Sequence, residues 1–471
     1  MNLRIALSLL CGGVGVAVVC AQNSTESDEH EHEPLGIDGS GTTNPQKCFW
    51  HIMAKFNEQI KLPTSFSYRG VGSGTGIKEF LGKGIEIDGV ETDTYLPYND
   101  FGSGDIPIKK EDYVDAYARG IEIVQLPFVL SAVTFFHSIP DLTDGLNMTA
   151  CLLAKIFNAE IMTWDNAEIL AINPNLDVPQ DYPIFVARRV LASSSTHAAT
   201  HYLRAQCPEG WPESMTSSEV EWHPSTNPCD GSDLMTACIK DNEGAIGYLD
   251  AAHGREEMLA EISLANGDGR FVTSKAVGAE GVLAAVNLTM VPTSADEDFS
   301  EVAFYNMPGS NTWPITLLSY IYIRKDLSFI KNPARRTLLK AFATAIFDPD
   351  YIGLCERYGL LPVPEALKQL SIEGLEMLEV DTSASENWIF EKDTMPGIGQ
   401  GDYVISSRRQ NFGLYESDRL SDDLAPLIEE VRQLKLELAS VKATSSGNAL
   451  GGIAASLVTG FVFLAGTVIF N

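Results

Sequence analysis

Two segments that are rich in glycine and hydroxyl side chains each run into a predicted helix. The first, Tyr68–Gly76, reads YRGVGSGTG and precedes helical residues Ile77–Leu81. The second, Ala187–Thr196, reads ARRVLASSST and precedes His197–Leu203. Because the first turn of a helix has unpaired N–H groups and partial positive charge, small residues and hydroxyls there let an anion approach. Two such segments, more than a hundred residues apart, predict two lobes that close on one oxyanion.

The length and composition of the chain limit the classes of protein to which it can belong. Its 471 residues predict more than one domain, and its hydrophobic content of 45% is enough for well-packed cores. The formal net charge of −30 argues against nucleic acid and anionic membrane surfaces as partners. Since the overall field repels a small anion, an anion site in this chain has to depend on local, oriented donors.

Residues 1–21 have the features of a secretory signal peptide. Arg4 provides a positive charge, residues 5–20 are apolar, and residues 19–21 form a cleavage site. Residues 22–35 are acidic and polar, which predicts a disordered linker. Three N-glycosylation sequons, which suit a eukaryotic secretory route, begin at Asn23, Asn147 and Asn287.

Six cysteines remain after cleavage, and an even number outside the cytosol favours disulfides. No C-x-x-C motif occurs among them, which argues against zinc binding or redox use. The sequence leaves fifteen disulfide pairings open. The alternative to full pairing is that some of the cysteines are free and buried. The six are Cys48, Cys151, Cys207, Cys229, Cys238 and Cys355.

Residues 36–372 alternate short, β-rich apolar runs with amphipathic segments. This alternation predicts a layered α/β fold. The expected strands are 121–130, 183–186 and 319–323, and the expected helices are 151–157, 167–170, 195–205 and 334–346. Residues 373–419 lack sustained periodicity, so they form either an extension packed on the globular part or a loose spacer.

Apolar residues follow an unbroken four-three spacing over residues 420–442. This heptad pattern predicts either a coiled coil, through which the chain would self-associate, or a single amphipathic helix packed on the body. Pro426 falls near the start of the expected helix, where the first turn tolerates proline. The heptad residues are Leu420, Leu424, Leu427, Val431, Leu434, Leu438 and Val441.

The last segment, residues 443–471, contains an apolar run at 449–470 that is long enough to span a bilayer. Small residues precede the run and no basic residue follows it. This arrangement favours the signal for a glycosylphosphatidylinositol (GPI) anchor over a transmembrane helix. Either anchor places the globular part on the outer face of the plasma membrane or in the lumen of the secretory pathway.

Eight segments, taken in order, resemble the phosphate-binding proteins of bacterial ABC phosphate-uptake systems, a family with the type II periplasmic-binding-protein fold. The resemblance spans about residues 36–370. Each segment alone is a weak signal, whereas eight in order make a strong one. The segments are GSGTTNP at 39–45, YRGVGSGTGIKEF at 68–80, DFGSGDIPI at 100–108, IVQLPFVLSAVTFF at 123–136, KIFNAEIMTWDNAEILAINPNLDVP at 155–179, ARRVLASSST at 187–196, EGAIGYLD at 243–250 and TWPITLLSYIYI at 312–323.

The resemblance implies two α/β lobes joined by two hinge strands, with the ligand buried between the lobes. Lobe 1 would comprise about residues 36–125 and 317–372, and lobe 2 about residues 126–316. The family binds phosphate with donors from two loops, one carboxylate, an arginine and a helix N-terminus. On this chain the corresponding residues are Thr43, Asn44, Ser73, Asp105, Arg189, Ser193, Ser194, Ser195 and Thr196.

Asp105 is the residue that would discriminate between anions. Phosphate keeps a proton near neutral pH and donates it to the carboxylate, whereas sulfate has no proton and would face the carboxylate's lone pairs. Where this chain has Asn44 the family usually has an aromatic residue, and where it has Leu191-Ala192 the family often has Asp-Gly. The loop is also one residue longer, so Arg188 and Arg189 both remain candidates for the arginine, which would bind two oxygens through its fork.

These features predict a cell-surface solute-binding protein that captures inorganic phosphate or a close oxyanion by hinge closure and serves a membrane transporter. The alternative is a structural or adhesion glycoprotein with a degenerate anion site. A phosphatase-like enzyme is less favoured, because the sequence has no H-E-x-x-H motif and no G-x-S-x-G elbow. His197 and His201 are spaced to chelate a metal, but no third ligand is apparent. We therefore expect no catalytic residue, no metal and no cofactor.

Overall fold

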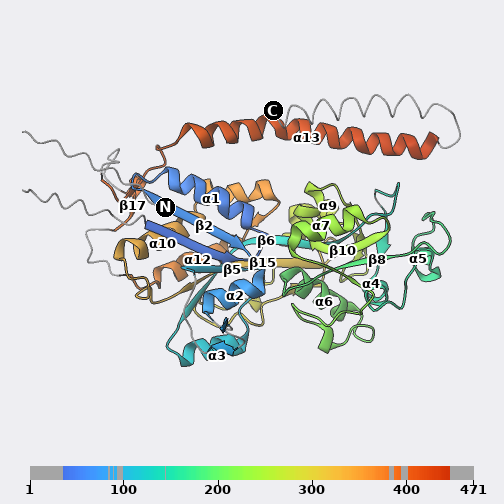
Figure 1. Cartoon of the computed structure of the whole chain (residues 1–471), viewed down its shortest axis with the longest axis horizontal. Coiled ribbons are helices and arrows are strands. Elements are labelled where there is room, and N and C mark those ends of the chain that lie inside the picture. The colour runs from blue at the N-terminus through green and yellow to red at the C-terminus, as the bar shows by residue number, and fades with distance from the viewer. Residues whose placement is uncertain are drawn as a thin grey trace, which may run out of the picture. The chain divides into compact units, whose positions relative to one another are not determined.

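The computed structural model describes residues 35–82, 85–87, 90–92, 99–143, 145–380, 387–393 and 401–445 (Figure 1). The predicted signal peptide, the predicted linker apart from Leu35, the sequon at Asn23 and the apolar run at 449–470 lie outside the described residues. Among the helices that are described, none combines the length and hydropathy needed to cross a membrane.

Two long antiparallel strands, β6 (Ile123–His137) and β15 (Ile315–Arg324), form the centre of the fold (Figure 1). Every residue of both strands is buried, which accounts for their nearly continuous apolar sequence. Their register shifts between Ser319 and Tyr320. Such an irregularity bends a strand and redirects its side chains, and it often occurs beside functional sites.

Three shorter strands extend the sheet beyond β15 and form the first lobe. They are β1 (Leu35–Gly41), β2 (Thr64–Gly70) and β5 (Phe101–Gly104). Strand β1 is parallel to the other two, and β5 pairs antiparallel with β15. The helices on this side are α1 (Gln46–Glu58), α2 (Ser73–Leu81), α3 (Lys110–Ala118), α10 (Pro333–Ile346), α11 (Pro349–Ile352) and α12 (Glu365–Glu376), with a 3₁₀ turn at Gly353–Tyr358.

Three other strands extend the sheet beyond β6 and form the second lobe. They are β10 (Ala245–Asp250), β8 (Phe185–Arg189) and β9 (Asn227–Cys229), so the sheet order is β2-β1-β5-β15-β6-β10-β8-β9. Strand β10 is antiparallel to β6, and β8 is parallel to both β10 and β9. The helices are α4 (Ala150–Phe157), α5 (Ala167–Ile172), α6 (Ser194–Gln206), α7 (Gly231–Asp241), α8 (Ala251–Glu256) and α9 (Ser274–Leu283).

Short strands and 3₁₀ turns complete the two lobes. The strands are β3 (Ile85–Ile87), β4 (Val90–Thr92), β7 (Asn147–Met148), β11 (Ala260–Glu261), β12 (Ser263–Ala265), β13 (Phe271–Val272), β14 (Phe304–Tyr305) and β16 (Leu361–Pro362), and the turns are Glu213–Met215 and Leu288–Met290.

The chain passes between the lobes through β6 and β15, so the first lobe is built from both ends of the globular part. This arrangement confirms the predicted two-lobed α/β fold with two hinge strands. Within each lobe the parallel strands end at one edge of the sheet, where open α/β sheets bind their ligands. The predicted site residues are Arg189, which is the last residue of β8, and residues in the segments that follow β1, β2, β5 and β8.

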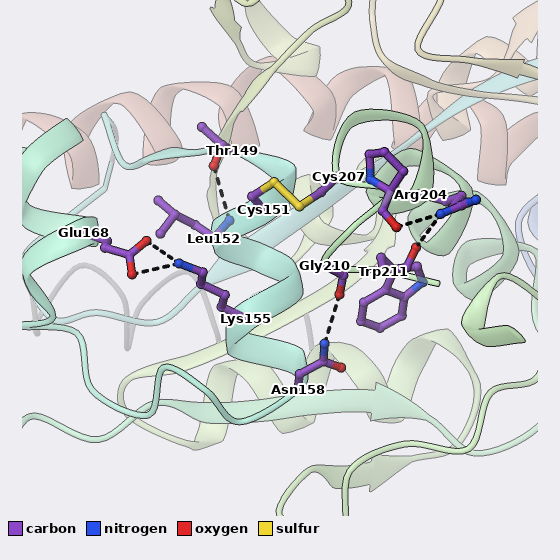
Figure 2. Close-up of a disulfide and its surroundings, with 11 residues drawn as sticks. Thr149, Cys151, Leu152, Lys155, Asn158, Glu168, Arg204, Cys207, Gly210 and Trp211 are labelled. Atoms are coloured by element: carbon purple, nitrogen blue, oxygen red, sulfur yellow. Dashed lines mark hydrogen bonds and ion pairs between the residues drawn. A yellow bond between two sulfur atoms is a disulfide. The ribbon is translucent and has the colours of Figure 1, made fainter. Parts of the chain in front are cut away.

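Three disulfides resolve the pairings that the sequence left open: Cys48–Cys355, Cys151–Cys207 and Cys229–Cys238. Figure 2 shows the second, which joins α4 to the residue that ends α6. Beside it, the Arg204 side chain on the last turn of α6 donates hydrogen bonds to the carbonyl oxygens of Pro208 and Trp211 (Figure 2). These contacts hold the C-terminal end of α6 and so help to fix the direction of its N-terminal end.

We expect replacement of both Cys151 and Cys207 with serine to lower the free energy of unfolding by about 4 kcal/mol, because the bond closes a long loop with a sequence separation of 56 residues. Replacing Cys229 and Cys238, which are separated by 9 residues, should lower it by only about 3 kcal/mol. Urea unfolding of the two double variants measures both values. The reverse ranking would contradict the loop-closure explanation.

Residues 387–409 pack against the first lobe where they are described. The Trp388 indole donates to the Ala334 carbonyl, and Arg409 donates to the Gln59 carbonyl. A parallel pair of short strands, β17 (Ile389–Phe390) and β18 (Val404–Ile405), is followed by α13 (Phe412–Ser445), and a 3₁₀ turn lies at Glu391–Asp393. These contacts favour the packed extension over the loose spacer.

The heptad pattern suggested that Pro426 lies near the start of its helix, but the structure places it in the interior. Helix α13 begins at Phe412, so Pro426 is an interior residue. It has no N–H to donate, and the carbonyl of Asp422 four residues earlier therefore lacks that bond. The helix begins earlier than expected because its first turns contact the globular part, which the heptad spacing does not report.

Candidate functional site

Asp105, which directly follows β5, lies at the centre of a buried polar cluster and is 2% exposed. Its Oδ2 accepts hydrogen bonds from Asn44 Nδ2 and Ser194 Oγ, both at 2.8 Å, and from the Thr42 hydroxyl. Its Oδ1 accepts from Ser319 Oγ at 2.7 Å. The donors come from both lobes and from a hinge strand, so this single carboxylate connects all three parts of the fold.

Ser73 supports Asp105 from a second loop. The Asp105 backbone N–H donates to Ser73 Oγ at 3.2 Å. Helix α2 begins at Ser73 and not at Ile77, so the glycine-rich segment itself forms the first helical turn. The prediction placed the helix start too late because glycines disfavour helix interiors. Here the need for close packing overrides that preference, since a Cβ on Gly76 would lie 2.3 Å from the Cα of Gly41.

The N-terminal turn of α6 is buried and enters the same cluster. Ser193 is the N-cap residue, and its Oγ accepts from the N–H groups of Ser195 at 3.2 Å and Thr196 at 3.5 Å. Ser194 therefore projects toward Asp105 while its neighbours hold the turn. The Thr196 hydroxyl lies 2.8 Å from the Tyr248 hydroxyl, which also accepts from the backbone N–H of Arg189 at 3.3 Å.

Arg189 and Arg188 have different surroundings at the end of β8. Arg189 is 5% exposed, and its buried Nε has no hydrogen-bond partner among the described residues. Burial lowers the pKa of its guanidinium. Arg188, by contrast, is partly exposed and donates from Nε to Thr226 Oγ1. Because a buried donor without an acceptor is costly, Arg189 is the arginine that an anion would stabilise.

The two lobes touch around this cluster. Thr43 Oγ1 in the first lobe lies 2.9 Å from Ser232 Oγ at the start of α7. Lys47 Nζ on α1 lies 2.6 Å from Glu256 Oε2 on α8. A Cβ on Gly74 would lie only 2.5 Å from the Cβ of Ala192 in the other lobe, so this close approach requires glycine. The structure is therefore a closed form.

Burial raises the pKa of Asp105 to about 6, and the hydrogen bonds from Thr42, Ser319 and Ser194 partly oppose this rise. Desolvation destabilises the charged carboxylate, while donated hydrogen bonds stabilise it. The carboxyl is therefore mostly ionised at neutral pH and becomes protonated under mildly acidic conditions.

The structure brings the predicted site residues together to different degrees. Asn44, Ser73 and Ser194 contact Asp105, whereas Thr43 contacts Ser232 across the lobes. Arg189 and Thr196 are joined through Tyr248, and Ser193 and Ser195 form the helix cap. The sequence prediction missed four polar residues of this cluster: Thr42, Ser232, Tyr248 and Ser319.

Ser319 and Thr42 had a signal in the sequence. Ser319 is a polar residue within the largely apolar run ITLLSYIYI, and a buried hydroxyl in such a strand requires a partner. Thr42 is adjacent to the predicted Thr43, and the choice between them depends on which side chain faces Asp105. Tyr248 and Ser232 had no local signal, because both reach the cluster only through tertiary packing.

His197 and His201 do not form a metal site in the described part of the chain, where no group of three or more potential metal ligands occurs. Their ring centroids are 4.1 Å apart, and the His201 ring stacks on Tyr305. Burial lowers the pKa of both imidazoles, that of His197 to about 3. Both rings therefore pack as neutral aromatic groups.

The two described sequons differ in accessibility. The Asn147 amide donates to the Ile172 carbonyl and lies in β7, whereas Asn287 precedes an exposed 3₁₀ turn at Leu288–Met290. The Asn287 side-chain oxygen Oδ1 accepts a hydrogen bond from the hydroxyl of Thr289 at 2.8 Å. Asn287 is thus the better placed of the two for modification.

Comparisons with known proteins agree with the two-lobed fold. The model of a family described as "PBP superfamily domain" matches residues 22–350, more than half of the chain. The phosphate-binding protein PstS of Haemophilus influenzae is 27% identical over 310 residues, which cover 65% of this chain and 82% of that protein. PstS of Methanocaldococcus jannaschii is 24% identical over 402 residues, which cover 80% of this chain and 96% of that protein.

A solved structure shares the fold. The high-affinity periplasmic phosphate-binding protein PfluDING, bound with phosphate, matches with a TM-score of 0.55 and 17% identity over 71% of this chain and 92% of its own. The two sequence relatives and this solved structure are all described as phosphate-binding proteins. These matches to phosphate-binding proteins confirm the resemblance inferred from the eight segments, and the chain belongs to the PBP superfamily.

Proposed function

We propose that this protein captures inorganic phosphate, or a close tetrahedral oxyanion, by closure of its two lobes around the cluster at Asp105. The observation that carries the proposal is a combination of three features: Arg189 Nε, which has no partner among the described residues, the buried N-terminal turn of α6, and the buried Asp105 at the lobe interface. A desolvated anion needs nearly every oxygen hydrogen-bonded, and this cluster offers charged, hydroxyl and backbone donors.

Each residue has a distinct part in this proposal. Arg189 supplies positive charge and a forked donor. The N-terminal turn of α6 supplies partial positive charge, and the hydroxyls of Ser73, Ser194 and Thr196 supply adaptable donors. Asp105 accepts the proton of the bound phosphate, which an unprotonated anion cannot provide. At about 1.5–3 kcal/mol for each charge-assisted bond, a handful of such bonds supports micromolar or tighter binding.

Calorimetric titration of the protein with phosphate, arsenate and sulfate at pH 7.5 tests the proposal. We expect phosphate and arsenate to bind and sulfate to bind much more weakly. The absence of heat with all three anions would favour a structural or adhesion glycoprotein that retains the fold without the site. Turnover of a phosphate ester that is lost in Ser194→Ala would instead favour an enzyme.

Sulfate binding should depend steeply on pH. Protonated Asp105 can donate its O–H to sulfate, whereas the ionised form repels it, so sulfate binding takes up a proton. With the pKa of Asp105 at about 6, sulfate affinity should rise about tenfold for each unit that the pH falls toward 6 and level off below it. Titrations from pH 5 to pH 8 measure this dependence of sulfate affinity on pH. A sulfate affinity that does not change with pH would contradict the role of Asp105 in repelling unprotonated anions.

The proposal extends to the location of the protein. The predicted signal peptide and apolar C-terminal run support a secreted protein held at a membrane, with GPI as the preferred anchor. Such a protein would concentrate phosphate at the surface and serve a membrane transporter. Release from membranes by a phospholipase specific for GPI tests the anchor, and retention after treatment would support a transmembrane helix.

A further inference from the structure

Five heptad residues of α13 form an apolar stripe that the described part of the chain does not cover. Leu420, Leu424, Leu427, Val431 and Leu434 are between 38% and 56% exposed. All side chains from Arg419 to Val431 are exposed. Figure 1 shows α13 as a separate long helix beside the globular part.

Ion pairs between described residues connect the first turns of α13 to the body. Asp418 lies 3.1 Å from His51 and 3.3 Å from Arg357, and Asp422 lies 3.1 Å from Arg357. Most of the stability of a helix in a protein comes from packing one of its faces. A 34-residue helix that contains an interior proline and a solvent-exposed apolar stripe therefore needs a partner along that stripe.

The spacing of the apolar residues assigns each one a heptad position. Leu420, Leu427, Leu434 and Val441 occupy d positions, and Leu424, Val431 and Leu438 occupy a positions. Leucine at d with a β-branched residue at a is typical of two-stranded coiled coils, and Val431 supplies one such residue. Pro426 falls at a c position, away from this seam.

The charges beside the stripe distinguish between orientations. The g positions are acidic (Asp423, Glu430 and Glu437), whereas Lys435 and Lys442 occupy e positions. In a parallel pair, each g residue faces the e residue five positions later on the other helix, so Glu430 meets Lys435 and Glu437 meets Lys442. In an antiparallel pair the g residues face each other, and acid would meet acid.

We propose that α13 mediates homodimerisation: the helices of two copies of the chain form a parallel, in-register, two-stranded coiled coil through residues 420–442. The partner is a second copy because the seam is complementary to itself, with apolar layers that match and charges that pair. This inference is independent of the proposed phosphate site, because none of the residues involved contacts that cluster.

A cysteine trap in the full chain tests both the partner and its orientation. The six cysteines of the globular part are paired, so a cysteine introduced on α13 provides a new thiol. Leu434→Cys places that thiol at a d position, where two copies meet only when the helices are parallel and in register. Glu429→Cys, at the outward f position, is the matched control.

We expect mild oxidation of micromolar full-length protein in detergent to convert most of the Leu434→Cys variant, but little of Glu429→Cys, to a dimer on a non-reducing gel. No dimer for Leu434→Cys, equal dimer for both variants, or a cross-link to another protein would each overturn the proposal.

Charge reversal provides a second, independent readout. Chains with Glu430→Lys and Glu437→Lys should be monomeric, as should chains with Lys435→Glu and Lys442→Glu, because like charges then meet across the seam. An equimolar mixture should restore the dimer in sedimentation velocity. Dimers that form equally well from each variant alone would show that these charges do not specify the pairing.

Discussion

Replacing Arg189 with alanine should weaken phosphate binding by about 30- to 5,000-fold, which corresponds to about 2–5 kcal/mol for removing one partner of a buried charge pair. The guanidinium is buried and its Nε has no hydrogen-bond partner among the described residues, so a bound anion would supply the acceptor that it lacks. Calorimetric titration of the variant with phosphate measures the loss.

Arg188→Ala is the matched control, because Arg188 is adjacent in the sequence but donates to Thr226 and to the Arg189 carbonyl. It should change phosphate affinity by less than about threefold. Thermal melts without phosphate check that both variants fold, and added phosphate should raise the melting temperature of Arg188→Ala but not of Arg189→Ala. Equal losses of affinity in the two variants would contradict the assignment of Arg189.

Replacing Asp105 with asparagine should reduce the preference for phosphate over sulfate by about two orders of magnitude, mainly through a gain in sulfate affinity. An uncharged amide no longer repels sulfate, and its N–H₂ group can donate to an unprotonated oxygen. The expected change in selectivity corresponds to the free energy of about one charge-assisted hydrogen bond, or about 1.5–3 kcal/mol, plus the relief of repulsion between the carboxylate and sulfate.

The fold should tolerate this substitution. The amide oxygen can take the place of Oδ2, which accepts from Thr42, Asn44 and Ser194, while the amide nitrogen takes the place of Oδ1. Ser319, the partner of Oδ1, can rotate its hydroxyl from donor to acceptor.

Asp177→Asn is the control for the Asp105 substitution, because it removes the same charge from an exposed residue in the segment between α5 and β8. It should leave the ratio of phosphate to sulfate affinity within about threefold of the original protein. Competition titrations of the three proteins at pH 7.5 compare these ratios. Unchanged selectivity in Asp105→Asn would show that the carboxylate does not select the anion.

Local patterns in the sequence were sufficient to predict the main elements. The expected strand at 319–323 lies within β15, the expected helix at 195–205 lies within α6, and the expected helix at 334–346 corresponds to α10. Periodicity and apolar content report these elements because each one buries a face of fixed spacing. The predicted starts of two helices were wrong: α2 begins four residues earlier and α13 eight residues earlier than expected.

The order of motifs along the chain determined the fold class and most of the candidate cluster. Glycine- and hydroxyl-rich segments before helices predicted donors, and this inference needs only the local chain because a helix N-terminus presents its N–H groups wherever it lies. Asp105 was identified only through the resemblance of residues 100–108 to the phosphate-binding family.

Tertiary structure alone decided which of these residues meet. Neither the choice of Arg189 over Arg188 nor the contacts of Thr42, Tyr248 and Ser319 could be derived from spacing, because they depend on how two lobes and a register shift orient side chains from distant segments. The disulfide pairings were undetermined for the same reason: pairing requires proximity in space, and the cysteines of two of the three bonds are 56 and 307 residues apart in sequence.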